Sequence, residues 1–514
     1  KKIADIPANN ISSESFTKIE NLTVSKIKGN STFVFIPKNV NVSAYNNINE
    51  TVEAAKVNQT EIGDIYKIRY TVKGSLFDNV SNYYNRTRHY FCVNLEGEKT
   101  GIVWQDELDF SLHFTTIDQN LVKNLTIELP NSNKGFLAAA TANGKGEIFY
   151  LTIFEQEGNP VNAVMSKTNS KTGININNKL DASKQLNMFA YRNETASMEI
   201  SGDKVLLMIA RTMNKSNDGL NHQGGIAVSF DINNLNLLKN YGQTTGHCFD
   251  NYLSVSSTGD FIGINLGDNY PRGINLHRIN EAMNSKVVYT FKTQHGESAD
   301  CYGIKTFPLY PEISTTTKKY YKWSNDNNTY TELGAVIETD DGFMVSFLGE
   351  PDKNGNALNN NEVETECSRN VGFVIVKKDF DNGSEDIFLS RGISETGGFY
   401  TFGGWWSEQK NTGLVWLTKY ANPALETAKN MKTIKLNDGN LLFLWEKWSE
   451  NNYKKTLALK TSQDGKPIGN IVELGSQVRL DRRDDLLVKG NQVIIMSGNK
   501  NEQKLELCII DLKN

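Results

Sequence analysis

The 514-residue chain has few cysteines, little proline and a small net charge. Its five cysteines form no CxxC pair, which argues against a zinc ribbon or a thioredoxin-type redox site. The formal net charge of -4 gives no reason to expect nucleic acid or an anionic membrane as a partner. No apolar run approaches the roughly 18 residues of a transmembrane helix. With ten prolines, no proline-, glycine- or serine-rich linker divides the chain.

A repeated unit is present instead. A polar turn containing glycine leads into a short apolar strand, a polar loop follows, and a second apolar strand ends the unit. Gly202–Lys204 before Val205–Met208 is one copy, and Asp-Gly and Asn-Gly turns supply the positive φ that tight hairpins need. The clearest turns lie near residues 144, 202, 259, 341, 438 and 489.

Two further stretches extend the series. Thr401–Trp406 with Gly413–Thr418 fills the long gap between the turns at 341 and 438, and Gly97–Thr100 begins a copy near the N-terminus. Units of about 40–60 residues with four short strands are typical of β-propellers. We therefore predict an all-β fold, a single β-propeller of seven or eight four-stranded blades with an N-terminal extended arm.

The first residues differ from the repeats. Residues 1–60 are polar and rich in asparagine, and they carry no tryptophan or cysteine. We predict a glycosylated arm or small β element over 1–60 and the propeller over 61–514. The run Phe33–Ile36 could add a strand to the sheet edge of another molecule, which would support self-association or binding of a protein partner. The favoured alternative is that the arm packs on its own propeller.

Asn-X-Ser/Thr acceptor sites indicate the compartment. Nine of the thirteen lie within residues 1–126, where chance predicts about two or three. The excess predicts a secreted, N-glycosylated protein outside the cell or at its surface. The alternative is a chance product of the Asn-rich composition. The sites are Asn10, Asn21, Asn30, Asn41, Asn49, Asn58, Asn79, Asn85, Asn124, Asn193, Asn214, Asn327 and Asn382.

The cysteines allow disulfides in such a compartment. Cys92 lies near the start of the first unit and Cys508 on the last strand, so a bond between them would staple the closure of the ring. Cys248 with Cys301 is the second pair to test. Buried cysteines without a disulfide are the alternative.

One loop has acidic and amide residues at the spacing of a calcium-binding loop. Asp352, Asn354 and Asn356 alternate as in D-x-N-x-N loops, but Ala357 and Val363 stand where an EF-hand needs glycine and glutamate. We expect a solvated turn there, with calcium as the weaker alternative, and no other cofactor.

Two groups of residues are candidates for ligand contact. Asp268 and Arg272 lie in a polar loop between two strands, where they form either a local ion pair or a ligand contact. The aromatic pair Trp405–Trp406 and the run Trp445–Trp448 could bind sugar rings by stacking, with Glu446 accepting hydrogen bonds from hydroxyls. The alternative is that the tryptophans fill the space between blades.

A resemblance to a group of known proteins supports the fold. Gly246–Asn251 with Gly267–Gly273, and Gly413–Tyr420 with Asp438–Trp448, resemble segments of secreted bacterial and protist β-propeller-like repeat proteins, mostly without known activity. The similarity extends over residues 90–512 and implies the propeller. It brings no catalytic residues.

No catalytic motif accompanies the repeats. Ser462–Gly465 lacks the spacing and the tryptophan of a sialidase Asp box, and no G-x-S-x-G elbow or phosphate-binding loop is present. We therefore expect a non-catalytic extracellular surface or matrix protein that mediates binding or assembly. A carbohydrate-active propeller, either a lectin or a glycosidase, is the alternative.

Overall fold

A computed structural model describes most of the propeller and part of the arm. The described residues are 11–19, 22–27, 33–37, 52–71, 88, 90–96, 99–118, 123–155, 161–191, 194–267, 273–290, 298–299, 320–321, 330–351, 367–380, 414–480, 486–499 and 504–513.

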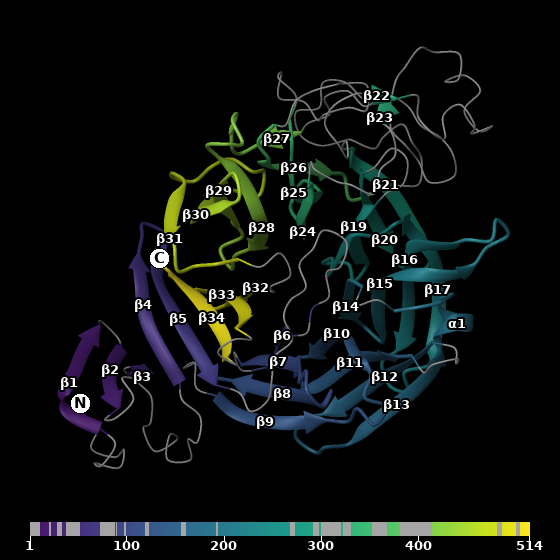
Figure 1. The fold of residues 1–514 in the computed structure, drawn as a ribbon, viewed down its shortest axis with the longest axis horizontal. Helices are drawn as coiled ribbons and strands as arrows, with labels where there is room; N and C mark the ends of the chain where they lie inside the picture. Colours follow the sequence, from purple (N-terminus) through teal and green to yellow (C-terminus); the bar gives the residue numbers. More distant parts are fainter. Residues whose placement is uncertain are drawn as a thin grey trace.

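Within these residues, seven antiparallel four-stranded blades are arranged in a ring (Figure 1). The prediction of a β-propeller is therefore confirmed, with seven blades. Blade 1 is β6 (Tyr90–Asn94), β7 (Thr100–Gln105), β8 (Leu112–Ile117) and β9 (Lys123–Leu129). Blade 2 is β10 (Phe136–Asn143), β11 (Glu147–Phe154), β12 (Asn162–Asn169) and β13 (Asn175–Asp181). Blade 3 is β14 (Ala196–Ser201), β15 (Lys204–Lys215), β16 (Asn221–Asp231) and β17 (Leu237–Gly246).

The next three blades follow in chain order. Blade 4 is β18 (Asp250–Val255), β19 (Phe261–Gly267), β20 (Gly273–Ile279) and β21 (Met283–Thr290). Blade 5 is β24 (Glu332–Glu338), β25 (Phe343–Gly349), β26 (Asn370–Val376) and β27 (Val415–Trp416). Blade 6 is β28 (Thr427–Lys435), β29 (Leu441–Ser449), β30 (Asn452–Thr461) and β31 (Val472–Gly475).

Blade 7 closes the ring with strands from both ends of the chain. It joins β32 (Leu486–Lys489), β33 (Gln492–Asn499) and β34 (Lys504–Leu512) to β5 (Gly63–Thr71), and β4 (Val52–Gln59) adds a fifth strand outside β5. All nine residues of β5 are in register with β34, from Gly63 opposite Leu512 to Thr71 opposite Lys504. The fifth strand thus lies within residues 1–60, the segment that we assigned to the arm.

The blade boundaries correct one detail of the prediction. Val415–Trp416 is the outer strand of blade 5, paired with β26 through Phe373 and Gly372, so Gly413–Thr418 does not belong to a blade of its own. The copy near Gly97 does begin a blade, because β6 and β7 flank it. Residues 401–413 lie outside the described part of the chain.

The predicted disulfide between Cys92 and Cys508 is wrong, because the two thiols are not joined. Leu507 and Ile509 of β34 pack toward blade 1 in the same cluster as Cys92, whereas Cys508 packs with Leu442 of blade 6. Successive strand residues face opposite sides of a sheet, so the Cys508 side chain points away from blade 1. Cys248 forms no disulfide, and Cys301 lies outside the described residues.

Hydrogen bonds between neighbouring turns define one face of the ring. The turns joining the first two strands of adjacent blades contact each other, so all of them lie on this face, the bottom face. The top face is the opposite one, where the second and third strands of each blade are joined. Three of the turn-to-turn bonds are Glu96 N to Gly144 O (2.8 Å), Ser201 Oγ to Gly259 O (2.7 Å) and Asn437 Nδ2 to Gly490 O (2.8 Å).

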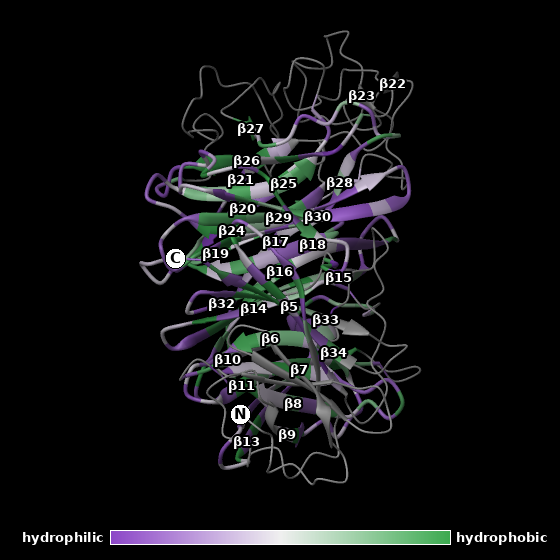
Figure 2. Cartoon of the chain, turned by 90° about the vertical axis from the view of Figure 1, so that its left-hand side faces the viewer, coloured by the Kyte–Doolittle hydropathy of each residue, from purple (hydrophilic) through white to green (hydrophobic). Residues whose placement is uncertain are grey.

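The hydrophobic core lies between neighbouring blades. One cluster, for example, joins Phe373 of blade 5 to Phe443 and Trp445 of blade 6. Figure 2 shows hydrophobic segments in the strands and hydrophilic residues in the connections at both faces. Each fully buried large side chain stabilises the fold by about 1.5–3 kcal/mol. The interfaces between neighbouring blades together form the closed radial core that the repeat pattern predicted.

Short elements complete the described structure. The arm contains a three-stranded sheet of β1 (Ile11–Ile19), β2 (Leu22–Ile27) and β3 (Phe33–Pro37), drawn beside β4 outside the ring in Figure 1. A small sheet pairs β22 (Ser298–Ala299) with β23 (Tyr320–Tyr321). The single helix in the described ranges is α1 (Ala182–Gln185), and none of those ranges holds a helix that could cross a membrane.

Candidate binding site on the top face of blade 6

Most candidate ligand residues lie outside the described part of the chain. This holds for Trp405, Trp406, Asp268 and Arg272, and for the calcium loop. The residues of the proposed calcium loop are Asp352, Asn354 and Asn356. Within the residues that the structure covers, no group of three or more His, Cys, Asp or Glu side chains could hold a metal ion. Of the candidates for ligand contact, only those on β29 can be placed: Glu446 and the tryptophans Trp445 and Trp448.

Glu446 ends the apolar part of β29 at the top face, and its side chain is completely buried. Its two carboxylate oxygens accept four hydrogen bonds. Oε1 accepts from Arg479 Nε (2.9 Å) and Leu480 N (2.9 Å), and Oε2 accepts from Asn430 Nδ2 (3.0 Å) and Trp448 Nε1 (2.8 Å). A buried carboxylate must be paired in this way to remain charged. Glu446 therefore organises the surrounding side chains and does not itself reach a ligand.

Asn430 connects this carboxylate to blade 5. It lies in a bulge of β28, between Lys429 and Lys432, with a left-handed φ of 54°. The bulge turns Asn430 N toward Glu332 Oε2 (2.8 Å) on β24. The carboxamide also donates to Leu480 O (2.9 Å), in the segment that leads to blade 7. Asn430 thus joins blades 5 and 6 to the linker before blade 7, beneath this part of the top face.

Four side chains form what we call the cation–aromatic cluster: Lys429, Trp448, Tyr453 and Arg479. The Arg479 guanidinium carbon lies 3.9 Å from the centroid of the Tyr453 ring and 5.6 Å from that of Trp448. Lys429 Nζ lies 4.4 Å from the Trp448 centroid, and the two rings meet edge to face at 5.9 Å. Cations over aromatic faces are attracted by the ring quadrupole, so the cluster holds two positive charges beside two half-buried rings.

The linker between blades 6 and 7, which follows Gly475, is hydrogen-bonded to the cluster through Tyr453. Tyr453 Oη donates to Val478 O (3.1 Å) and is also bonded to Thr456 Oγ1 (3.0 Å). Burial, partly offset by the bond to Thr456, raises the pKa of the Tyr453 hydroxyl. The phenol therefore stays neutral and holds the linker that carries Arg479.

Trp445 has a different role from Trp448. Its side chain is completely buried between blades 5 and 6, and its Nε1 donates to Tyr420 Oη (3.1 Å). The alternative that tryptophan fills the space between blades therefore holds for Trp445. Trp448 lies beyond the apolar part of β29 and is half-buried at the top face.

Sequence reasoning found part of this site and missed the rest. Glu446 and Trp448 were visible because they lie two residues apart on one strand, β29. Lys429, Tyr453 and Arg479 carry no local signal, since they come from β28, β30 and a linker. They are brought together only by the pairing of blade 6, in which Lys429 lies opposite Glu446.

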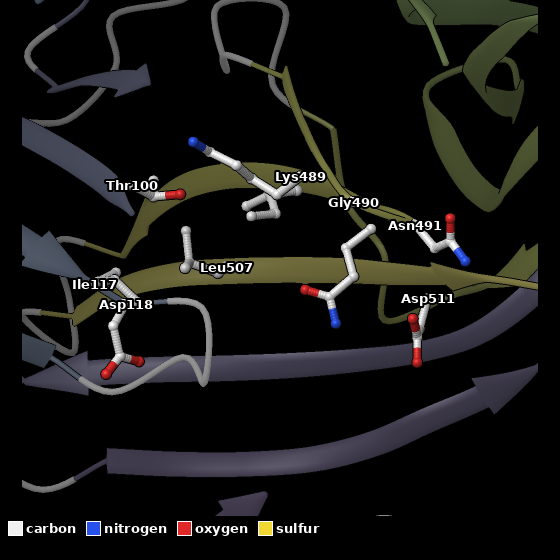
Figure 3. Close-up of a pocket in the computed structure, with 10 residues that line it drawn as sticks. Thr100, Ile117, Asp118, Lys489, Gly490, Asn491, Leu507 and Asp511 are labelled. Atoms are coloured by element: carbon white, nitrogen blue, oxygen red, sulfur yellow. The ribbon is translucent and has the colours of Figure 1, made fainter. Parts of the chain in front are cut away.

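A cavity of about 430 Å³ opens elsewhere, on the bottom face between blades 7 and 1 (Figure 3). Thr100, Lys489, Asn491 and the carboxylates Asp118 and Asp511 line it. Figure 3 shows the two carboxylates at opposite ends of the cavity, with Leu507 between them. Burial, and then the charge of Asp64, raise the pKa of Asp511.

Two glycosylation candidates have described side chains. Asn58 on β4 borders an open groove of about 700 Å³ with Glu473 of β31, and its Nδ2 donates to Glu473 O (3.3 Å). Asn214 is the penultimate residue of β15, and its Nδ2 donates to Ser183 O (2.8 Å). Asn124 lies on β9, and the other ten acceptor sites fall outside the described residues.

Comparisons with known proteins support the propeller fold alone. No protein-family model and no curated protein matches the sequence. Among similar solved structures, the WD40 domain of SCAP from fission yeast is 9% identical, with a TM-score of 0.33, and the match covers 90% of this chain and 98% of that one. The β-propeller domain of the Trilobed protease from Pyrococcus furiosus is 7% identical, with a TM-score of 0.36 and coverage of 92% and 96%. An ulvan lyase from a new family of polysaccharide lyases is 8% identical, with a TM-score of 0.37 and coverage of 84% and 81%. At these identities the likeness concerns the propeller fold alone, and these similar propellers come from proteins of different kinds.

Proposed function

We propose that this protein is a non-catalytic extracellular glycoprotein that binds a ligand through the top face of blade 6. The observation that carries the proposal is the buried Glu446 carboxylate, whose four donors include Arg479 and Trp448 of the cation–aromatic cluster. Such a carboxylate holds neighbouring side chains in one geometry. Preorganised side chains lose little entropy when a ligand binds, which is the property of a binding site.

The same observation favours binding over glycoside hydrolysis at this site. A glycosidase acid or nucleophile must touch the substrate, and the acid must release and regain a proton. Glu446 has no exposed surface, and all of its bonds are to donors within the fold. A lectin stays as the second candidate function, because the rings of Trp448 and Tyr453 are only half-buried.

The extracellular location rests on the acceptor sites in residues 1–126. Secretion would expose this segment to the glycosylation machinery, and the groove beside Asn58 would accommodate the first sugars. The arm sheet β1–β3 offers a second surface, through which the protein would associate with itself or with a protein partner.

A binding panel with a matched variant tests the proposal. Immobilised neutral and acidic polysaccharides and matrix proteins are probed with the wild-type protein and with Trp448→Ala. The control is Leu425→Ala, because Leu425 is exposed at 69% in the linker before β28. We expect one class of ligand to bind, Trp448→Ala to lose that binding, and the control to retain it. Release of reducing ends from a bound polysaccharide, or unchanged binding by Trp448→Ala, would overturn the proposal.

A further inference from the structure

We propose that Lys56 and Asp64 form an intramolecular isopeptide bond between β4 and β5, with Asp511 of β34 as the proton donor. The bond is an amide between the lysine side-chain nitrogen and the carboxyl carbon of the aspartate. It lies in blade 7, where the N-terminal strands close the ring. Its formation does not depend on ligand binding at blade 6.

The two reacting groups are in contact and largely screened from water. Lys56 Nζ lies 2.7 Å from Asp64 Oδ2, and the two side chains are 14% and 12% exposed. A nucleophile and a carboxyl carbon held together in this way react far faster than separate molecules. The pair Lys67–Glu506 is also largely buried, but Glu506 binds Arg69 as well. A second cation keeps that carboxylate charged, which makes its carbon a poorer target.

Strand register places a second carboxyl group beside this pair. Asp64 and Asp511 lie directly opposite each other on β5 and β34, so their side chains share one face of the sheet with Cβ atoms about 4.5–5.5 Å apart. Lys56 lies opposite Tyr66, two residues along β5 from Asp64, and therefore shares that face. Asp64 thus has an amine on one side and a carboxyl group on the other.

The surroundings of Asp511 suit a proton donor. Burial, and then the charge of Asp64, raise the pKa of Asp511 above its ordinary value of 3.8. Gln492, opposite it on β33, is hydrogen-bonded to the carboxyl group and orients it. Asp511 also lines the cavity between blades 7 and 1, into which a released water can pass (Figure 3). A carboxyl group in this position can give a proton to a leaving group and take one back.

The reaction releases one water and needs no cofactor or oxidant. A proton first passes from Lys56 Nζ to Asp64 Oδ2 along their hydrogen bond, because neutral groups cost less than charges away from water. The amine lone pair then attacks the Asp64 carboxyl carbon and forms the C–N bond. Asp511 protonates the hydroxyl, which leaves as water when the C–O bond breaks, and Asp511 then accepts a proton from the nitrogen. The product is a neutral amide, and Asp511 is regenerated.

Such a bond reinforces the closure of the ring. It joins β4 to β5 across the turn at 60–63, and β5 is the strand that pairs with β34. β4 then stays beside β5 when the arm that precedes it is pulled or unfolds. A covalent cross-link also restricts the unfolded chain, which favours the folded state.

Mass spectrometry of the full chain, produced in bacteria so that it carries no N-glycans, tests the proposal. The wild type is compared with Lys56→Arg, which keeps the cation but cannot form the amide, and with Asp511→Asn. Lys460→Arg is the matched control, because Lys460 Nζ lies 2.7 Å from Asp438 Oδ2 while these side chains are 26% and 47% exposed. The melting temperature of each protein establishes that it is folded.

We expect the wild type and Lys460→Arg to be one water lighter than their sequences, and Lys56→Arg to have its full mass. Trypsin should not cut the wild type after Lys56, and fragment spectra should join Lys56 to Asp64. Asp511→Asn should lower the cross-linked fraction by about tenfold or more. Full mass of the folded wild type overturns the proposal, as does full cross-linking of folded Asp511→Asn. Loss of water with normal cleavage after Lys56 also overturns it, since a succinimide at an aspartate gives that result.

Discussion

At the residue scale, His277 shows how burial fixes a protonation state. On β20, it is fully buried between Asn265 and Ser285, and its Nε2 donates to Asn265 Oδ1 (2.7 Å) while Nδ1 faces Ser285 Oγ (2.7 Å). Asn265 Nδ2 in turn lies 3.5 Å from Cys248 Sγ. Burial lowers the pKa of His277 from 6.5 to about 3, so the imidazole is neutral in the folded protein.

We predict that His277 makes the fold less stable in acid. Between pH 6.5 and about 3 the unfolded chain binds one more proton than the folded chain, so the free energy of unfolding falls as the pH decreases, by about 1.4 kcal/mol per unit. Urea unfolding of the wild type and of His277→Asn at several pH values measures this difference. His222→Asn, which removes an exposed imidazole bonded to Asp218, is the control. A constant difference between wild type and His277→Asn from pH 7 to 4 would contradict the prediction.

The thiol of Cys508 provides a second prediction at this scale. Burial raises its pKa to about 12, and its side chain faces the core between blades 6 and 7. A thiol of this kind reacts only when the fold opens. We expect the wild type and Cys508→Ala to titrate equally with a disulfide reagent when folded, and the wild type to show one more thiol in guanidinium chloride. Equal counts in the unfolded state would place Cys508 in a disulfide and contradict the structure.

At the element scale, closure of the ring by β5 makes a prediction about truncation. Ile65 and Ile68 of β5 are buried in two different interfaces, toward blades 6 and 1 respectively. A chain lacking residues 1–51 retains β4 and β5, so we expect its melting temperature to stay close to that of the full chain. A chain lacking residues 1–71 exposes the edge of β34 and opens both interfaces, so it should melt much lower or aggregate. Similar stability of the two truncated proteins would show that β5 does not close the ring.

Asp511 gives this closure a pH dependence. It lies directly opposite Asp64 on the paired strands, and burial, with the charge of Asp64 as a further cause, raises its pKa above 3.8. A raised folded pKa stabilises the protein at low pH, and this stabilisation is lost as the pH rises through that pKa. We therefore expect Asp511→Asn to gain stability relative to the wild type as the pH increases from 4 to 7, measured by thermal unfolding. Asp203→Asn, an exposed turn variant, should show no such trend.

Local turn chemistry explains why the blades could be predicted. Five of the turns between the first two strands of a blade have glycine at a positive φ, which other residues rarely adopt. Such a signal lies within a few residues of sequence, so it can be read without the fold. The glycines are Gly146 (φ 89°), Gly202 (58°), Gly259 (86°), Gly439 (83°) and Gly490 (52°).

Outer strands and distant pairings could not be read in the same way. The outer strand β27 has two residues, too few for an alternating pattern, so Val415 and Trp416 were assigned to an extra blade. The pairing of β5 with β34 joins residues more than 400 positions apart, and the sequence of neither strand indicates which strand it pairs with. The cation–aromatic cluster has the same origin, since Arg479 reaches Glu446 across a linker.

At the scale of the whole molecule, closure and location are linked by the N-terminal residues. The segment that supplies the two outer strands of blade 7 is also the one in which the acceptor sites concentrate. The acceptor sites of this segment that the structure describes are Asn58 on β4 and Asn124 on β9, the outermost strands of blades 7 and 1.

We predict that expression through a eukaryotic secretory pathway yields a glycosylated protein in the medium. Enzymatic removal of N-glycans should lower its apparent mass in several steps, and up to five of these steps should be lost on deletion of residues 1–51, which carry five of the thirteen acceptor sites. Asn58→Gln should remove one glycan, because Asn58 borders an open groove, and should leave the melting temperature nearly unchanged. Gln59→Ala retains the acceptor motif at Asn58 and is the matched control. A secreted protein of unmodified mass would contradict the extracellular assignment, and a glycan retained in Asn58→Gln at the same count as in the control would show that this site is not used.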